Sequence, residues 1–253
     1  MFRLAFSLLG LLLAGTPAAA MIGNAPAADP ALVRHLVMIV GSHGFCTATV
    51  VARDLVLTAA HCVPPGTDYK LIERVGADTP QFADVARIVR HPQFSMDAYL
   101  AHRATADVAL LKLARPLDGR LAPAPLAAPA RPVTPGDVLT VAGFGLAAPG
   151  DGRSGGTARA ALLTVTGVPG TLQIRLFDPA TRGERAGLGA CTGDSGAPAF
   201  DASGGRPAII GVVSWTTGPN LSDGCGGLTG LTPLTRYKDW IIRAAQEMGS
   251  RLP

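Results

Sequence analysis

The sequence has little charge and no concentrated block of it. Only 16% of its 253 residues are charged, whereas 48% are apolar. The chain can therefore bury a substantial core, and it lacks the charge excess of a disordered protein. The formal net charge of +4 is spread without a run of Lys or Arg. This pattern argues against nucleic acid or a membrane surface as the partner.

Several local signatures are also missing. None of the four cysteines forms a C-x-x-C pair, which disfavours metal-binding and thioredoxin-like interpretations. No G-x-x-x-x-G-K-[ST] motif occurs, so GDGRSGG at 150–156 is interpreted as an exposed loop and not as a phosphate cradle. Neither a repeat of fixed period nor heptads are present. We therefore expect no metal and no cofactor.

Only the N-terminus carries a long apolar run. Arg3 precedes a mostly apolar stretch at 4–14, and small residues follow at Ala18 and Ala20. This order predicts a signal peptide over 1–20. The alternative, a membrane anchor, is too short, since a spanning helix needs about 20 apolar residues. Removing Arg3 leaves 4 − 1 = +3, and we expect the mature chain, 21–253, to be secreted or periplasmic and monomeric.

Glycine and proline are abundant, with 31 and 21 residues, and short apolar runs recur between them. Their Val, Ile and Thr content is typical of strands in a barrel or sandwich. Strands are expected at 36–40, 47–51, 55–60, 86–89, 108–113, 138–144, 161–167, 172–177 and 208–215. The Pro- and Ala-rich stretch 114–137 is expected to be a connector. Helical spacing of apolar residues predicts a C-terminal helix over about 234–249.

The four cysteines allow three pairings in a compartment that permits disulfides. The pairing local in sequence, Cys46 with Cys62 and Cys191 with Cys225, is favoured.

Three stretches contain the residue types of nucleophilic catalysis: LTAAHC with His61, TADVALL with Asp107, and GDSGAP with Ser195. A serine hydroxyl is a poor nucleophile at neutral pH. Acyl transfer therefore needs an imidazole to accept its proton and a carboxylate to hold the imidazole in the right tautomer. Gly193 permits close backbone approach, and the amides of Gly193 and Ser195 are candidates for an oxyanion hole.

LTAAHC, ADVALL, VAGFG, GDSGAP and VVSW closely resemble motifs of the trypsin/chymotrypsin family of serine endopeptidases. The resemblance runs from about residue 21 to 240. It implies an all-β fold of two antiparallel Greek-key six-stranded barrels, at about 30–118 and 138–232, followed by the C-terminal helix. It also implies a protein or peptide substrate and an acyl-enzyme mechanism.

By the same resemblance, His61 is general base, Asp107 its orienting partner, and Ser195 the nucleophile. Gly193 and Ser195 supply the oxyanion hole. Ser214 resembles the family's serine beside the buried aspartate. Of the two expected disulfides, Cys46–Cys62 would hold the loop that carries His61, and Cys191–Cys225 would join the two walls of the substrate pocket. Ala197 stands where the motif has glycine, and it is harmless unless its φ is positive.

The pocket residues implied by the resemblance are Gly189, Ala190, Ser214, Trp215, Thr216 and Gly227. Its floor, Gly189, offers no carboxylate, so burying Lys or Arg there would cost several kcal/mol. Thr216 is expected to narrow the mouth, while Gly226 and Gly227 leave the opposite wall open. We therefore expect cleavage after small or medium uncharged residues.

The stretch MIGN at 21–24 resembles the family's buried N-terminus, whose ammonium pairs with the aspartate before the nucleophile, here Asp194. No Lys or Arg lies between Arg3 and Arg34, so a tryptic activation site is missing. We expect that cleavage after Ala20 by signal peptidase frees Met21 and activates the enzyme. The alternative is processing elsewhere.

The sequence also bears on two other functions. An α/β-hydrolase esterase has its triad in the order Ser, acid, His, whereas this chain has His, Asp, Ser. A catalytically silent protease-fold binding module often loses a catalytic residue, and this chain retains all three. The sequence therefore favours a secreted serine endopeptidase.

Overall fold

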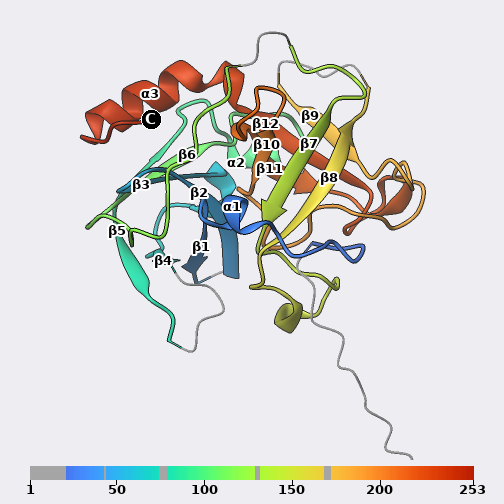
Figure 1. Ribbon diagram of the computed structural model, residues 1–253, viewed down its shortest axis with the longest axis horizontal. Coiled ribbons are helices and arrows are strands. Elements are labelled where there is room, and N and C mark those ends of the chain that lie inside the picture. Colours follow the sequence, from blue (N-terminus) through green and yellow to red (C-terminus); the bar gives the residue numbers. More distant parts are fainter. Residues whose placement is uncertain (1–20, 43, 74–78, 129–131, 168–171) are drawn as a thin grey trace, which may run out of the picture.

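A computed structural model of the chain describes residues 21–42, 44–73, 79–128, 132–167 and 172–253. The expected signal peptide, 1–20, lies outside them. Two closed antiparallel barrels of six strands dominate the fold (Figure 1). The first holds β1 (Leu36–Gly41), β2 (Gly44–Ala52), β3 (Leu55–Thr58), β4 (Lys70–Ile72), β5 (Phe82–Arg90) and β6 (Ala109–Leu113). The second holds β7 (Val138–Gly143), β8 (Arg159–Val165), β9 (Ile174–Phe177), β10 (Pro198–Asp201), β11 (Ala208–Thr216) and β12 (Leu228–Pro233).

Both barrels have the same topology. The first closes in the order β1-β2-β3-β6-β5-β4 and the second in the order β7-β8-β9-β12-β11-β10. In each, the fourth strand returns to pair with the first, which is a Greek-key connection. The predicted all-β fold of two six-stranded barrels is confirmed.

The helices are short except at the C-terminus. They are α1 (Pro30–Val33), α2 (Met96–Leu100), α3 (Lys238–Glu247) and the 3-10 turns η1 (Ala60–Cys62), η2 (Gly152–Ser154), η3 (Pro219–Leu221) and η4 (Leu234–Arg236). Helix α3 follows the last strand of the second barrel but contacts β6 of the first (Figure 1). Its apolar face buries Ile241 and Ala244. This helix therefore ties the two barrels together.

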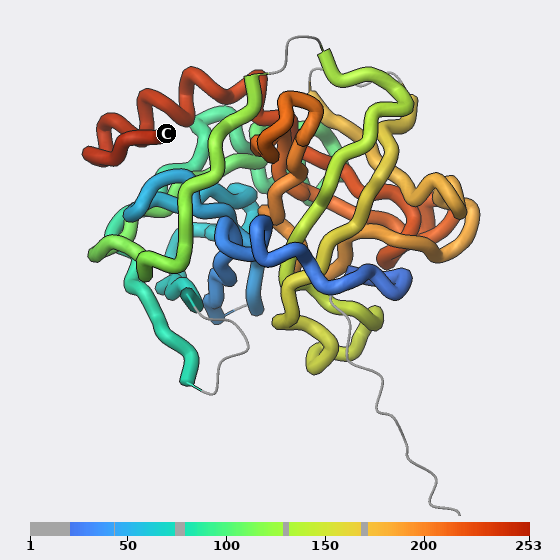
Figure 2. Tube along the Cα trace, viewed as in Figure 1, coloured from blue at the N-terminus to red at the C-terminus, as the bar shows by residue number. Residues whose placement is uncertain are grey.

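The N-terminal segment, drawn in blue, crosses the junction between the barrels (Figure 2). Its early part pairs with the second barrel, where Ala28 N–H donates to the Ala158 carbonyl at 3.0 Å. Its end reaches the first barrel, where Val50 N–H donates to the His35 carbonyl at 2.8 Å. The segment is thus anchored to both halves of the molecule.

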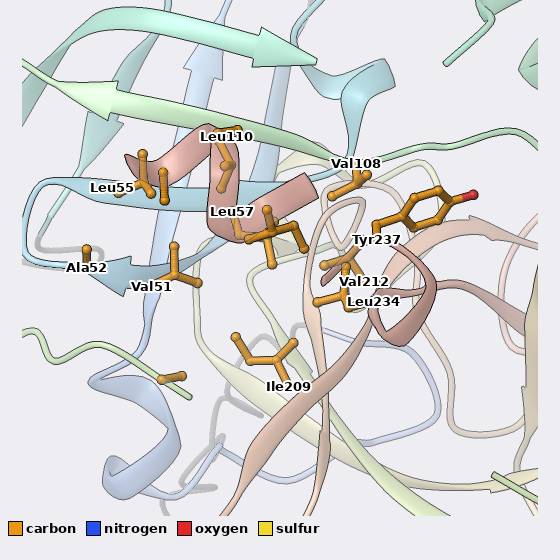
Figure 3. Packing of buried hydrophobic residues seen from close by; sticks show 14 of the residues in the cluster. Val51, Ala52, Leu55, Leu57, Val108, Leu110, Ile209, Val212, Leu234 and Tyr237 are labelled. Atoms are coloured by element: carbon orange, nitrogen blue, oxygen red, sulfur yellow. The ribbon is translucent and has the colours of Figure 1, made fainter. Parts of the chain in front are cut away.

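A buried apolar cluster also spans the junction. Leu55, Leu57 and Leu110 of the first barrel and Ile209 and Val212 of the second belong to one cluster (Figure 3). Each barrel has a further interior cluster of its own. Burial of this shared surface fixes the barrels relative to each other, and with them any site built from both.

Within the described residues, no helix is long and apolar enough to cross a membrane.

Candidate active site

His61 and Asp107 come together because their strands are neighbours. His61 lies in η1, directly after β3, and Asp107 lies two residues before β6. Strands β3 and β6 are paired with Thr58 opposite Ala109. The end of one strand therefore meets the start of the other, and two side chains 46 residues apart in sequence become partners.

The carboxylate of Asp107 is fully buried and has three hydrogen-bonding partners. Its Oδ1 accepts from the backbone N–H of His61 at 2.9 Å, and its Oδ2 lies 2.7 Å from His61 Nδ1. Ser214 Oγ donates to the same Oδ2 at 2.6 Å. These bonds offset the cost of burying the carboxylate. With Nδ1 as donor, Nε2 of His61 is left as the acceptor of a proton.

Ser195 lies in a tight turn that only glycine permits on either side. Gly193 and Gly196 have φ values of 93° and 78°. A Cβ at Gly193 would lie 2.3 Å from the ring of Phe45, and the backbone there could not approach so closely. Ala197 is not among the residues with positive φ, so its methyl group causes no backbone strain. The turn thus retains its geometry with alanine in the motif.

Two N–H groups of this turn are available to a substrate oxygen, as an oxyanion hole requires. Within the described residues, neither Gly193 N–H nor Ser195 N–H donates a hydrogen bond. Ser195 and His61 line the same cleft, although the serine hydroxyl makes no hydrogen bond to the imidazole in the described chain. Such bonds are often long without substrate and tighten in the complex.

The cleft has a volume of about 910 Å³ and is lined from both barrels. Tyr99 was not predicted as part of it. Its ring is stacked on the His61 imidazole, with ring centroids 4.3 Å apart and an interplanar angle of 12°. Burial, and then the charge of Asp107, raises the pKa of Tyr99 to about 12. The sequence signal that could have indicated α2, the helix that carries Tyr99, is Ser95 at its N-cap. The Ser95 hydroxyl accepts from Ala98 N–H at 3.1 Å.

The expected pocket residues divide into two groups. Ser214, Trp215 and Thr216 line the cleft. Gly189 and Ala190 are buried and do not line it.

The hydroxyl of Thr216 closes the space between these groups. Its single O–H lies within hydrogen-bond distance of two carbonyl oxygens, those of Ala190 at 2.9 Å and Leu228 at 3.1 Å, and is shared between them. Ala190 precedes the turn of the nucleophile and Leu228 lies on β12, the strand paired with β11, so the side chain of Thr216 connects these two segments behind the cleft.

The open wall expected at Gly226 and Gly227 is wrong. A Cβ at Gly227 would lie 2.0 Å from the carbonyl oxygen of Gly218, so the chain covers this position. Gly226 packs against the floor, where a Cβ at Gly189 would lie 3.4 Å from its Cα. The chain at Gly218 therefore occupies the space beside Gly227 that an open wall would leave free.

The carboxyl of Asp194, directly before the nucleophile, is fully buried. Its Oδ1 accepts from Gly145 N–H at 2.8 Å and its Oδ2 from Cys191 N–H at 2.9 Å. Burial raises the pKa of Asp194 to about 7, although the two amide hydrogen bonds lower it.

Met21 is also fully buried, and Ile22 N–H donates to the Gly189 carbonyl at 3.3 Å. The nitrogen of Met21 is a peptide nitrogen in the uncut chain. Within the described residues it makes no ion pair with Asp194.

The disulfides join Cys46 to Cys62 and Cys191 to Cys225, the pairing favoured from the sequence. Cys46, His61 and Cys62 are the one group of potential metal ligands found in the described part of the chain. Both sulfurs belong to the disulfide, so neither is available as a thiolate ligand.

Comparison with known proteins shows where the chain has relatives. The family model described as Trypsin matches residues 22–241. Serine protease 56 of Homo sapiens is 30% identical over an alignment of 249 residues that covers 90% of this chain and 38% of that protein. Snake venom serine protease BPA of Bothrops jararaca is 30% identical over 227 residues, covering 82% of this chain and 81% of that protein. Trypsin-1 of Salmo salar is 27% identical over 193 residues, covering 73% of this chain and 75% of the relative.

Proposed function

Because this chain belongs to the trypsin family of serine proteases, we propose that it is a secreted endopeptidase that works through an acyl-enzyme and cleaves after small uncharged residues. Membership of the family makes the protein a serine-type endopeptidase. The proposal adds its compartment, its catalytic residues and its preferred substrate.

The observation that carries the mechanism is the buried chain of contacts from Ser214 through Asp107 to His61. Ser214 Oγ and His61 Nδ1 lie 2.6 and 2.7 Å from the same carboxylate oxygen. This arrangement supports a fixed imidazole whose Nε2 takes the proton of Ser195 as Oγ attacks the substrate carbonyl. The carboxylate stabilises the resulting imidazolium ion.

The tetrahedral intermediate places negative charge on the former carbonyl oxygen. The N–H groups of Gly193 and Ser195, which have no acceptor in the described chain, would donate to that oxygen. The imidazolium of His61 then protonates the leaving amine, and the acyl group remains on Ser195. Water then attacks the carbonyl carbon of the ester while His61 accepts its proton. His61 passes this proton to Ser195 Oγ as the acyl group leaves.

The bridge made by Thr216 supports a preference for small residues. Thr216 lines the cleft and its hydroxyl lies within hydrogen-bond distance of the Ala190 and Leu228 carbonyls, whereas Gly189 and Ala190 are buried and do not line the cleft. A long side chain would have to displace this bridge. A Lys or Arg side chain would also lose its hydration without gaining an ion pair, at a cost of several kcal/mol. Glycine or alanine before the scissile bond fits best.

The N-terminal contacts support activation by a single cut. If signal peptidase cleaves after Ala20, the new ammonium of Met21 would be the partner of the buried carboxyl of Asp194. Met21 is already buried, and Ile22 already pairs with Gly189. An ammonium ion there would compensate the burial of the carboxylate. Disulfides persist in secreted and periplasmic proteins, which supports export. N-terminal sequencing of active protein tests this proposal, and a start other than Met21 would defeat it.

A fluorophosphonate probe tests the enzyme itself. We expect the mature protein to be labelled at Ser195 and the matched Ser195→Ala variant to remain unlabelled. Folded protein that is not labelled would favour the alternative, a catalytically silent binding module.

A peptide library tests the preference. Thr216→Gly, which removes both the hydroxyl and the volume, should increase cleavage after leucine and phenylalanine more than Thr216→Val, which removes the hydroxyl and keeps the volume. An unchanged profile for Thr216→Gly would refute the assignment of Thr216.

A further inference from the structure

Thr47 joins the two barrels directly behind the candidate oxyanion hole. It lies in β2 of the first barrel and is fully buried. Its Oγ1 donates to the carbonyl of Gly193 at 2.9 Å and accepts from the N–H of Phe144 at 3.1 Å. Both of these partners belong to the second barrel. The hydroxyl therefore acts at once as donor and acceptor across the junction.

The peptide unit that Thr47 contacts is the one between the two amides of the oxyanion hole. The hole uses Gly193 N–H and Ser195 N–H, and the peptide from Gly193 to Asp194 links them along the chain. The N–H of this peptide donates to the Cys191 carbonyl at 2.9 Å. Its carbonyl accepts from Thr47 Oγ1. Both ends of the peptide unit are thus held.

The backbone of Thr47 adds to this support. Its N–H donates to the carbonyl of Ser195 at 3.0 Å. Its own carbonyl accepts from Thr58 Oγ1 at 2.9 Å, which fixes the strand behind it. The turn around Ser195 is therefore held at the carbonyls of Gly193 and Ser195 by one residue of the opposite barrel.

We propose that Thr47 is a positioning residue for the oxyanion hole. This inference rests on the proposed peptidase function. By fixing the peptide between Gly193 and Asp194, the Thr47 hydroxyl sets the direction of the two N–H groups that receive the developing negative charge. Thr47 does not touch the substrate. It acts through the backbone of the nucleophile turn.

A second buried threonine of β2, Thr49, makes no such hydrogen bonds, so the contacts of Thr47 do not follow from burial in this strand alone. It lies two residues further along the same strand, on the same face, and is fully buried. Within the described residues its Oγ1 has no hydrogen-bonding partner. Thr49→Val is therefore a matched control, because it makes the same chemical change in the same strand without removing a hydrogen bond.

A role in positioning predicts a particular kinetic signature. The oxyanion exists only in the transition state and the intermediate, so a misdirected hole lowers kcat and leaves KM little changed. Removing a direct donor of an oxyanion hole lowers kcat about 100- to 1,000-fold. Since Thr47 acts indirectly, we expect a decrease of about 10- to 100-fold for Thr47→Val.

The experiment compares wild type, Thr47→Val, Thr47→Ser and Thr49→Val on one peptide substrate. Thr47→Ser keeps the hydroxyl and should retain kcat within about threefold of wild type, and Thr49→Val should do the same. A peptide aldehyde inhibitor, whose hemiacetal oxygen occupies the hole, gives a second readout. Its inhibition constant should rise for Thr47→Val in proportion to the loss in kcat/KM.

Thermal unfolding identifies variants that fail to fold. If Thr47→Val does not fold, Thr47→Ser and Thr47→Ala replace it as a pair that differs by one hydroxyl. Equal kcat for the members of the folded pair, or an effect on KM alone, would overturn the role of Thr47. If wild type is active and the variants give one of these results, only the role of Thr47 is overturned. If wild type is folded but inactive, the proposed function and this inference are overturned together.

Discussion

The buried carboxyl of Asp194 gives the sharpest test of activation. Within the described part of the uncut chain, Asp194 receives two backbone hydrogen bonds but forms no ion pair. Burial raises its pKa from an ordinary value of 3.8 to about 7, although the amides of Cys191 and Gly145 lower it. The uncut protein therefore holds Asp194 protonated more readily than the unfolded chain does.

The sign of the effect on stability follows from this shift. Since the folded-state pKa is raised, the contribution to stability is fully present below about pH 4 and is lost as pH rises to about 7. The shift is about 3 pKa units, from 3.8 to about 7, which corresponds to a loss of up to about 4 kcal/mol. An ammonium on Met21 would remove this loss by pairing with the ionised carboxylate.

The perturbation is to compare protein that begins at Met21 with protein that keeps an uncleavable N-terminal extension. Urea unfolding at pH 5 and pH 8 measures the free energy of unfolding of each form. The extended form should lose stability between these pH values by a few kcal/mol relative to the form that begins at Met21. Asp194→Asn, which cannot ionise, should remove the difference in pH dependence between the two forms and leave the contribution of His35 and His91, whose pKa values burial lowers. Activity should follow the same order, since the turn that carries Ser195 includes Asp194.

Two results would refute this reasoning. Equal pH dependence for the two N-termini would show that Met21 does not neutralise Asp194. Extended protein with full activity at pH 8 would show that the free amine is not needed for the active arrangement.

Three other expectations can be measured directly. Ser214→Ala removes a donor at 2.6 Å from Asp107 and should lower kcat/KM by at least about 10-fold in steady-state assays; unchanged kinetics would contradict the proposed orienting contact. Lys112→Met removes the Nζ that contacts Asp54 at 2.5 Å and should lower the free energy of unfolding in urea by about 1 kcal/mol, since the pair is half-buried. An unchanged unfolding midpoint would contradict a stabilising contribution from this ion pair. The pKa of Tyr99 is raised to about 12, so a spectroscopic titration of wild type minus Tyr99→Phe should show no tyrosinate signal below about pH 11, and a step near pH 10 would be inconsistent with its burial.

The strands that sequence patterns predicted are the ones with enough apolar, β-branched residues to be recognised locally. Nine of the observed strands fall at expected runs, whereas β4, β10 and β12 do not. Strand β4 has three residues, β10 begins with Pro198, and β12 contains glycine and ends with Pro233. Their strand conformation is imposed by pairing with neighbours in the closed barrels and not by local preference.

The candidate site divides in the same way. The side chains of His61, Asp107 and Ser195 were predicted because their chemistry is specific and their flanking motifs are local. Tyr99 was missed because its contact with the imidazole depends on where α2 folds back over the cleft. No periodicity or motif records a contact of this kind.

The sequence by itself determined the chemistry available to this protein: one nucleophile, one base, one acid, four cysteines and the order of two sets of strands. The tertiary structure alone decided which atoms meet. It placed the hydroxyl of Thr216 against the Ala190 and Leu228 carbonyls, turned the hydroxyl of Thr47 toward Gly193, and covered Gly227 with the chain at Gly218. The physical reason is that these contacts join residues distant in sequence, and hydrogen-bond geometry and close packing are fixed only when both barrels have closed.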